Sequence, residues 1–367
     1  MQFNNILRYP KKVYREINNN ISKIIKNGQF ILGPEVEKLE KKLSATVKTK
    51  YCVGVSSGTD ALLISLLSLN IKHNDEVIVP SLSWISTAQV IKILGAKPIF
   101  VDIELDTCNI DANLVEKKIS KKTRAIIAVS LFGNTPDFNK LNKISNKYKI
   151  PIIEDAAQSL GAKYKNKFSC NLTTIGCTSF FPSKTLGSFG DAGAVFTNSS
   201  KLYKKIKKIR NQGKFRSGIH DILGVNGRID TLQCGILLSK LKHFKKELKL
   251  REVKYNYYHN FFKKNNFKSI KMLNYSKHGK SAFSQFTILS SNRKAIIEQF
   301  KRDKIPYSIY YSRPMHMQKI FNLKYKNFNK KSILVSKKTI SIPFSPYITK
   351  KEQNKVCKSF LKIRKKI

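Results

Sequence analysis

One lysine stands inside a long stretch of small, apolar and hydroxyl-bearing residues. Between Phe168 and Ser200 the only basic residue is Lys184 and the only acidic one is Asp191, in a chain that holds 70 lysines and arginines. Apolar surroundings lower the pKa of a lysine from about 10.4 and turn its amine into a usable nucleophile. A lysine that snorkels out of a glycine-rich loop is the structural alternative. The segment makes Lys184 the first candidate for chemistry.

A carboxylate lies at the end of an apolar run elsewhere in the chain. Asp155 follows the apolar residues of "IIEDAAQS", where an unpaired ionised side chain is costly. It therefore needs a cation or several hydrogen-bond donors, and either a protonated ring nitrogen or a structural arginine would serve. Gln158 follows closely and can offer an amide to the same ligand.

Two further features could hold a planar, phosphorylated ligand. Gly58 and Thr59 come after a strand-like run and open a helix-like one, so backbone N–H groups and a hydroxyl could bind phosphate there. An ordinary helix N-cap would explain the same residues. Trp84, the only tryptophan, lies in the polar loop "PSLSWIST" and could stack on a ring, although core packing is an equal alternative.

Together these residues match the demands of one cofactor, pyridoxal 5′-phosphate. It needs a lysine for its Schiff base, an acid on its pyridine nitrogen, a phosphate cradle and a group that covers its ring. The acid keeps that nitrogen protonated, so that the ring can accept electrons when the neighbouring carbon loses its proton. Each signal is weak alone, and their combination predicts this cofactor.

The elements that carry these residues alternate between strand-like and helix-like patterns. Nearly continuous apolar runs predict strands at 51–57, 76–81, 97–103, 124–132, 151–157, 177–181 and 193–198. This pattern predicts an α/β fold with a mostly parallel sheet, whose ligands bind beyond the carboxyl ends of the strands. We expect a large domain over 1–245 and a smaller α+β domain over 246–367, with the N-terminal segment able to pack on the smaller one.

Composition excludes some functions and weakens others. A formal charge of +47 is typical of proteins that bind nucleic acid. The charges are scattered, however, and no known nucleic-acid-binding motif accompanies them, so we expect no specific nucleic-acid partner. No apolar run reaches the roughly 20 residues needed to cross a bilayer, and the start lacks a signal-peptide pattern. The six cysteines lack zinc-site spacing, which predicts no metal and reduced thiols in a cytoplasmic protein.

Motifs along almost the whole chain resemble those of the DegT/DnrJ/EryC1/StrS family of sugar aminotransferases. The resemblance implies the type I fold of aspartate aminotransferase and pyridoxal phosphate as the cofactor. It rests on "GQFILGPEVEKLE" (28–40), "SSGTDAL" (56–62), "DEVIVPSLSWISTAQVI" (75–91), "GAKPIFVDIELDTCNID" (95–111), "IIEDAAQSLGA" (152–162), "TSFFPSKTLGSFGDAGAVFTN" (178–198) and "GVNGRIDTLQCGIL" (224–237).

The resemblance implies a role for each matching residue. Lys184 would form the Schiff base and carry the proton, and Asp155 would pair with the pyridine nitrogen. Gln158 would hydrogen-bond the ring hydroxyl, and Trp84 would stack on the ring. The phosphate would be held by Gly58, Thr59 and Ser179, with Asn226 from the neighbouring subunit. The implied enzyme is therefore a homodimer with a shared active site.

The motifs "CNLTTIGCTSFFPSK", "VSLFGNTPDF" and "VNGRIDTLQ" are most similar to family members that aminate C3 of a UDP-2-acetamido-3-keto-hexuronic acid for O-antigen synthesis. The implied donor is glutamate, which leaves as 2-oxoglutarate. Arg228 would receive the sugar carboxylate, which a planar guanidinium fits well. The sugar pocket departs from the family pattern, because its usual His-Tyr-Pro is replaced by Tyr310 and Tyr311 followed by Ser312. Arg313 is expected to be a surface cation, and His316 is a candidate substrate contact.

Other functions remain open at this point. A neutral 3- or 4-keto sugar carried by UDP or dTDP could replace the uronic acid. Some relatives are sugar dehydratases with a histidine in place of the lysine, and Lys184 argues against that chemistry. A non-catalytic regulatory relative is a third alternative, which the complete set of cofactor residues disfavours.

Overall fold

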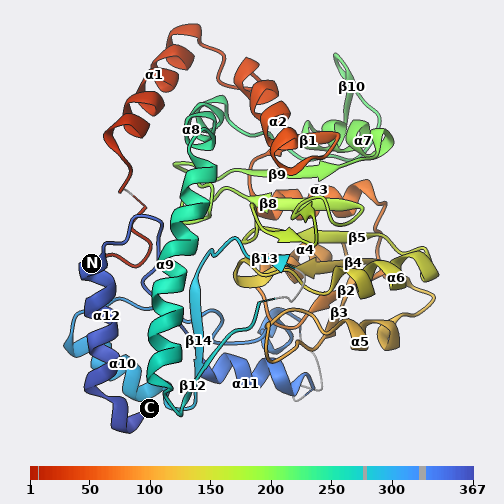
Figure 1. The fold of residues 1–367 in the computed structure, drawn as a ribbon. Helices are drawn as coiled ribbons and strands as arrows, with labels where there is room; N and C mark the ends of the chain where they lie inside the picture. Colours follow the sequence, from red (N-terminus) through yellow and green to blue (C-terminus); the bar gives the residue numbers. More distant parts are fainter. Residues whose placement is uncertain (7, 276–278, 322–327) are drawn as a thin grey trace.

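A seven-stranded sheet forms the centre of the N-terminal two-thirds of the chain (Figure 1). The computed structural model describes residues 1–6, 8–275, 279–321 and 328–367. The strand order is β1-β9-β8-β5-β4-β2-β3, and in this sheet β9 alone runs against its neighbours. The strands are β1 (Tyr51–Val55), β2 (Glu76–Pro80), β3 (Lys97–Val101), β4 (Thr123–Val129), β5 (Ile152–Asp155), β8 (Ile175–Ser179) and β9 (Gly193–Thr197).

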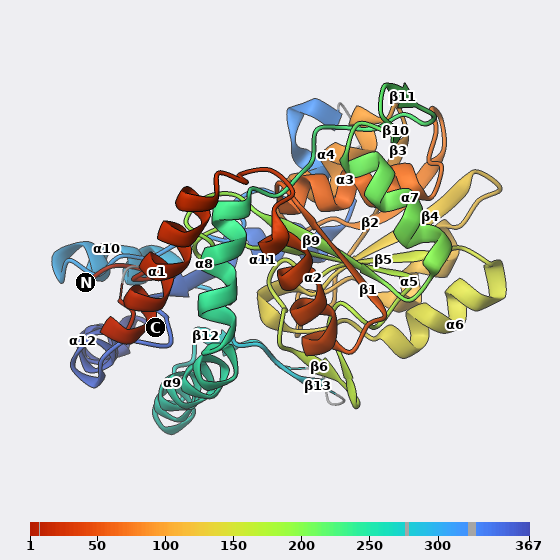
Figure 2. The same cartoon turned by 90° about the horizontal axis from the view of Figure 1, so that it is seen from above.

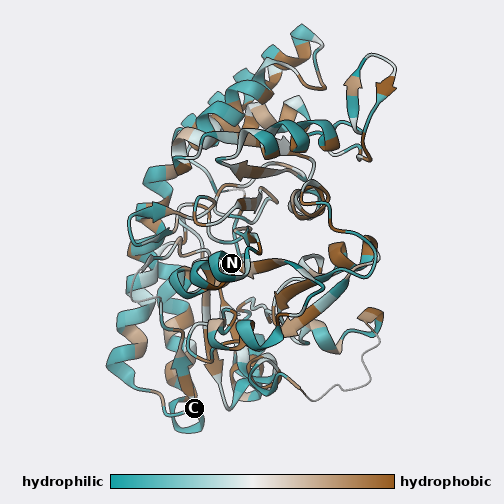
Figure 3. Cartoon of the chain, turned by 90° about the vertical axis from the view of Figure 1, so that its right-hand side faces the viewer, coloured by the Kyte–Doolittle hydropathy of each residue, from teal (hydrophilic) through white to brown (hydrophobic). Residues whose placement is uncertain are grey.

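The sequence prediction of a mostly parallel sheet is confirmed, and each of the seven predicted strands is present in it. The reason is burial, because β2, β4, β5, β8 and β9 are covered on both faces and therefore carry nearly unbroken apolar sequence. Figure 3 shows this contrast, with apolar strands inside and hydrophilic faces on the outer helices.

Helices cover the sheet on both sides (Figure 2). On one face lie α3 (Gly58–Ser68), α4 (Ser86–Ile93) and α7 (Ser200–Arg210), which share a hydrophobic core with the strands. On the other face lie α2 (Pro34–Val47), α5 (Ala112–Val115), α6 (Phe138–Tyr148) and α8 (Thr231–Leu241). The sheet is thus the middle layer of three, as its unbroken apolar strands require.

A second core lies in the C-terminal third and is built on aromatic side chains such as Tyr258, Phe286 and Phe360. It packs around a three-stranded antiparallel sheet of order β12-β14-β15. Its elements are α9 (Phe244–Asn265), β12 (Ile270–Met272), β14 (Phe286–Ser290), α10 (Arg293–Arg302), α11 (Lys330–Lys338), β15 (Thr339–Ile342) and α12 (Lys350–Lys362). The predicted boundary at residue 245 falls in the first turn of α9, and we propose α9 as the connection between two domains.

The N-terminal segment crosses to the C-terminal part of the chain. The backbone N–H of Phe344 donates to the carbonyl of Phe3 at 3.1 Å, and Arg8 pairs with Glu352 at 2.7 Å. The next helix, α1 (Lys11–Asn27), packs against α8. The first residues therefore close over the region where the two cores meet.

Among the described residues, we find no helix whose apolar length would reach across a bilayer.

Candidate active site

A cavity of about 300 Å³ lies at the carboxyl ends of β1, β2, β4, β5 and β8, on the edge of the sheet where α/β folds bind ligands. Residues from the C-terminal part close it from the other side. Nine of the predicted site residues line this one cavity: Gly58, Thr59, Trp84, Asp155, Gln158, Ser179, Lys184, Tyr310 and Tyr311. Residues from five separate segments of the sequence therefore meet at one point.

Asp155 ends β5 and is buried at the cavity wall. Its Oδ2 accepts a hydrogen bond from Thr87 Oγ1 at 2.9 Å, and its Oδ1 accepts from the N–H of Ala157 at 3.2 Å. Burial raises the pKa of the carboxyl, while these two donors and the charge of Lys184 act in the opposite direction. The described residues give Asp155 no ion-pair partner within 4.0 Å, so a cationic ligand could still bind it.

Lys184 lies in a loop that hydrogen bonds hold tightly. Its backbone N–H donates to Phe181 O at 2.9 Å, and the hydroxyl of Ser188 donates to Phe180 O at 2.6 Å. Burial lowers the pKa of the Lys184 amine, and the nearby Asp155 partly offsets this effect. The lysine is thus shifted toward the neutral form that a nucleophile requires.

The start of α3 forms the anion-binding end of the cavity. Ser57 caps this helix by accepting the N–H of Asp60 at 3.0 Å, and Thr59 donates its hydroxyl to Ser86 Oγ at 2.9 Å. A Cβ on Gly58 would lie 2.7 Å from Cβ of Ser179, so only glycine lets that serine approach the helix end. The first N–H groups of a helix have no partner within it, and this terminus is therefore suited to phosphate.

Aromatic and amide side chains line the remaining wall. The Trp84 side chain is 60% exposed, and its ring lies 6.1 Å from the ring of Tyr311. Gln158 accepts the N–H of Phe132 at 2.7 Å and donates to the hydroxyl of Tyr311 at 3.1 Å. This exposure excludes core packing of Trp84, which was the structural alternative. The indole is therefore free to contact a ligand in the cavity.

Two predicted residues lie outside this cavity, on the segment that pairs with the edge strand β1. Asn226 is exposed and forms a backbone bridge with Asn211. Arg228 donates from Nη1 to Asn211 Oδ1 at 2.8 Å, and its buried Nε has no hydrogen-bond partner among the described residues. Neither residue reaches the cavity of its own chain, so their predicted roles now depend on a second subunit.

His316 lies in the core and not at the cavity. Its ring is buried beside the rings of Phe100 and Phe328, at centroid distances of 6.2 and 4.9 Å. It does not line the cavity, because the turn after Tyr311 directs the chain into the core of the large sheet. The structure therefore gives no support to His316 as a substrate contact. Arg313 is exposed, as expected.

Sequence reasoning missed two residues of the site. Thr87 was not singled out, although it lies in the same "SWIST" segment as Trp84 and is the side-chain donor to Asp155. Gln285 lines the cavity from the segment before β14, and no sequence motif pointed to it. For Thr87, its position in a polar loop after a strand was a usable signal.

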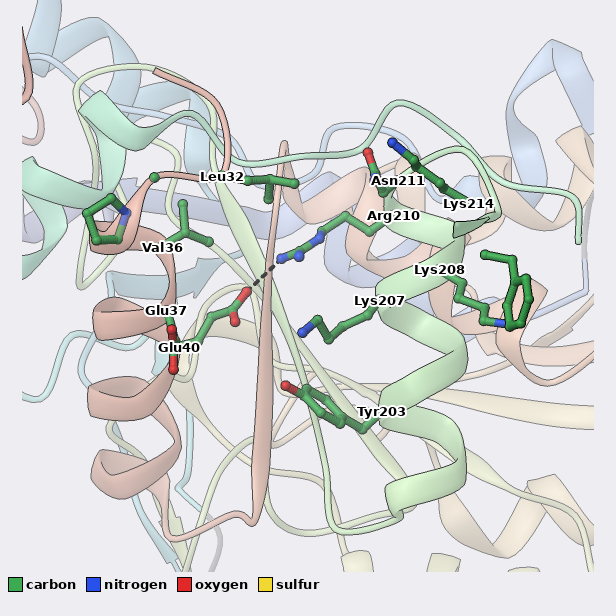
Figure 4. Close-up of a pocket in the computed structure, with 13 residues that line it drawn as sticks. Leu32, Val36, Glu37, Glu40, Tyr203, Lys207, Lys208, Arg210, Asn211 and Lys214 are labelled. Carbon is green, nitrogen blue, oxygen red and sulfur yellow. Dashed lines mark hydrogen bonds and ion pairs between the residues drawn. The ribbon is translucent and has the colours of Figure 1, made fainter. Parts of the chain in front are cut away.

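A larger hollow of about 500 Å³ lies elsewhere, between α2 and α7 (Figure 4). Glu40 and Arg210 point toward one another across it and form an ion pair of 2.6 Å. Lysines and Phe215 form its outer wall, and it contains none of the predicted site residues. The larger volume of this hollow therefore does not make it the candidate active site.

The cavity with Lys184 fits pyridoxal phosphate on the evidence of its own side chains. Three features lie around one space: a buried carboxylate that forms no ion pair with any described residue, a lysine with a lowered pKa, and a helix start that only glycine allows. No cluster of three or more His, Cys, Asp or Glu suited to a metal ion occurs in the described parts of the chain.

Comparison with known proteins agrees with this geometry. The model of the DegT/DnrJ/EryC1/StrS aminotransferase family matches residues 11–361. The UDP-2-acetamido-2-deoxy-3-oxo-D-glucuronate aminotransferase of Pseudomonas aeruginosa is 42% identical over 320 residues, which cover 87% of this chain and 88% of that protein. A pleiotropic regulatory protein of Geobacillus stearothermophilus is 33% identical over 93% of this chain and 92% of its own.

The fold is also that of a solved relative. The structure of NtdA from Bacillus subtilis with bound cofactor PMP has a TM-score of 0.92 to this chain at 28% identity, covering 100% of this chain and 85% of that one. The match to the family model extends over nearly the whole sequence, and the chain belongs to the DegT/DnrJ/EryC1/StrS aminotransferase family.

Proposed function

We propose that this protein transfers the amino group of glutamate to C3 of UDP-2-acetamido-2-deoxy-3-keto-hexuronic acid, with pyridoxal phosphate as the cofactor. The observation that carries the proposal is that Lys184 and Asp155 line one cavity together with the glycine-bearing start of α3. The 42% identical relative, whose name specifies the 3-oxo-glucuronate sugar, supports this choice of substrate.

Different residues of the cavity would bind different groups of the cofactor. Pyridoxal phosphate supplies an aldehyde and a ring that accepts electrons. Asp155 would hold a proton on the ring nitrogen, and the N–H groups of Gly58 and Thr59 would bind the phosphate together with Ser179. Lys184 would hold the aldehyde through its amine, and the same side chain would carry a proton to or from the substrate carbon.

A homodimer with a shared site completes the proposal. Exposed apolar side chains gather on two segments beside the hollow of Figure 4. One precedes α2 and carries Phe30, Ile31 and Leu32. The other lies around the hairpin of β10 (Lys214–Arg216) and β11 (Ile219–His220) and carries Phe215, Ile219 and Leu223. Exposed apolar groups of this kind favour contact with another protein surface. A second subunit placed there would bring its own Asn226 and Arg228 toward the cavity, where Arg228 could bind the sugar carboxylate.

The nucleotide sugar suggests a role in making a surface polysaccharide such as O-antigen. A cytoplasmic enzyme fits this role, because all six cysteines are buried free thiols.

The test combines colour with turnover. Purified protein loaded with pyridoxal phosphate should absorb visible light, and borohydride should fix the cofactor to Lys184 in the wild type and not in Lys184→Ala. Glutamate should bleach the colour as 2-oxoglutarate appears, and the 3-keto uronic acid should restore it as the 3-amino sugar forms. Restoration by a neutral keto sugar alone would overturn the substrate and the role of Arg228. A coloured protein that glutamate fails to bleach would favour a regulatory role, as in the Geobacillus relative's name.

A further inference from the structure

Gln285 is a cavity residue to which the cofactor chemistry gives no task. It lies directly before β14 and lines the same cavity as Lys184 and Tyr311. Its Oε1 is shielded from solvent and has no hydrogen-bond partner among the described residues. Buried amide oxygens are almost always paired, because an unpaired one loses the hydrogen bonds that water would give it. A partner for Gln285 is therefore expected from whatever fills the cavity.

The backbone that presents Gln285 is held in an unusual conformation. Phe283 has a φ of 48°, in the left-handed region that bulky residues rarely adopt. The N–H of Ala282 and the hydroxyl of Ser281 both donate to Gly133 O, at 3.0 and 2.9 Å. Gly133 itself has a φ of 85°, and a Cβ there would lie 3.0 Å from the backbone N of Ser284. Strain of this kind persists where the surroundings fix it, and it gathers at functional sites.

Arg251 holds the same segment from the opposite side. It is a buried residue of α9, and its Nη1 donates to the carbonyls of Phe283 and Ser284, both at 3.4 Å. The segment before β14 is thus fixed between the loop at Gly133 and a helix of the C-terminal part. Gln285 is therefore held on a rigid backbone, as is expected of a residue that recognises a ligand specifically.

The chemistry of an amide oxygen selects among the ligands of the proposed reaction. The ring nitrogen, phosphate and aldehyde of the cofactor already have partners in Asp155, the start of α3 and Lys184. The side-chain and α-carboxylates of glutamate carry no proton at neutral pH, so they cannot donate to an oxygen. Its amino nitrogen is the group that reacts beside Lys184, so it would be engaged there. A sugar carries hydroxyl and acetamido N–H groups, and both are donors.

We propose that Gln285 is a specificity residue for the sugar: its Oε1 accepts a hydrogen bond from a hydroxyl or an amide N–H of the nucleotide-linked sugar, and it contributes nothing to the recognition of glutamate. This inference rests on the aminotransferase function proposed above. On this proposal, Gln285 from the C-terminal part of the chain acts only in the step in which the sugar reacts, and has no part in the step in which glutamate reacts.

The test compares two amines in one assay with cofactor-loaded Gln285→Met. Glutamate and the UDP-linked 2-acetamido-3-amino uronic acid each bleach the visible absorbance by giving up their amino group. The substitution should raise the half-saturating concentration of the amino sugar about tenfold, as loss of one buried hydrogen bond implies. The value for glutamate should change by less than about twofold. Gln89→Met, at an exposed position of α4, is the matched control and should change neither.

Equal weakening of both amines, or a lowered melting temperature with loss of cofactor, would overturn the inference and leave Gln285 a structural residue. An unchanged value for the amino sugar would overturn it as well. Failure of the proposed function gives a different result, because the wild type would then respond to no amino sugar. If the wild type responds only to neutral UDP-3-amino-N-acetylglucosamine, the uronic acid is wrong, and the same comparison at Gln285 is made with that sugar.

Discussion

The hydroxyl of Thr87 donates to Oδ2 of Asp155 at 2.9 Å, and the two residues come from different strand ends of one sheet. Thr87 lies in the first turn of α4 after β2, and Asp155 is the last residue of β5. The bond uses one carboxylate oxygen, and the N–H of Ala157 uses the other. Both bonds stabilise the charged form of a carboxyl whose pKa burial raises. The two bonds therefore hold Asp155 in place and offset part of the effect of burial, which raises its pKa.

Asp155→Asn should abolish most of the activity while leaving the fold intact. The amide has nearly the same shape, but it cannot hold a proton on a ring nitrogen by its charge. We expect turnover with glutamate to fall by at least about 100-fold, which is typical of removing one electrostatic group from an active site. Absorbance spectra and single-turnover kinetics measure the effect.

Glu154→Gln is the matched control, because Glu154 is the adjacent buried carboxyl of β5 and lies outside the cavity. Its oxygens accept from Ser130, Ser169 and Cys170. The control should retain the turnover of the wild type. Equal losses in both variants would mean that the charge of Asp155 has no special part in the reaction.

Thr87→Val should shift the pH profile of turnover. The hydrogen bond from Thr87 lowers the pKa of Asp155, so its removal raises that pKa further. Because the ionised carboxylate is the active form, the acidic limb of the profile should move to higher pH. Thr197→Val removes a comparable buried hydroxyl, which donates to Thr174 O at the opposite edge of the sheet. An unchanged acidic limb in Thr87→Val would contradict the role given to this bond.

Trp84 offers a direct optical test of the cofactor site. It is the only tryptophan in the chain and its indole is 60% exposed at the cavity, so the emission of the protein reports on this wall alone. Adding pyridoxal phosphate to the cofactor-free protein should quench that emission. Trp84→Ala should weaken cofactor binding by roughly 2- to 12-fold, the range expected for one stacked ring pair. Unquenched emission with a full complement of bound cofactor would show that the ring lies elsewhere.

The sequence allowed the sheet and the core of the site to be predicted because their signals are local. Lys184 departs from the composition around it, and Asp155 ends a buried apolar strand that cannot tolerate an unpaired charge. Gln285 carries no such signal, since an amide in a strand-like run is ordinary. It matters only because folding packs the segment before β14 against the ends of the large sheet. The burial of His316 carries no local signal either, because it depends on a contact with Phe100 from a distant strand.

Glu154 should make the stability of the fold depend on pH. Burial raises the pKa of its carboxyl from its ordinary value of 4.5 to about 7. The folded protein therefore keeps a proton that the unfolded chain releases, and folding stability should fall as pH rises through this interval. Glu154→Gln should reduce that fall, and urea unfolding midpoints at several pH values measure it. A slope identical to that of the wild type would show that Glu154 is ionised in the fold.

The shared site can be tested by mixing two inactive variants. Lys184→Ala lacks the amine, and Arg228→Ala lacks the proposed contact with the sugar carboxylate from the other subunit. In a hybrid dimer one site carries both defects, and the other carries neither. Random exchange makes half of the dimers hybrids, and each hybrid has one intact site out of two. A mixture in equal amounts should therefore recover about a quarter of the wild-type activity.

This recovery should appear only after the two variants have exchanged subunits. A mixture of Lys184→Ala with Asp155→Asn is the control. Those two residues line the cavity of one chain, so a hybrid of these variants has one defect in each site and stays inactive. An inactive first mixture, with exchange shown by size or tag, would place Arg228 in the same site as the lysine of its own chain.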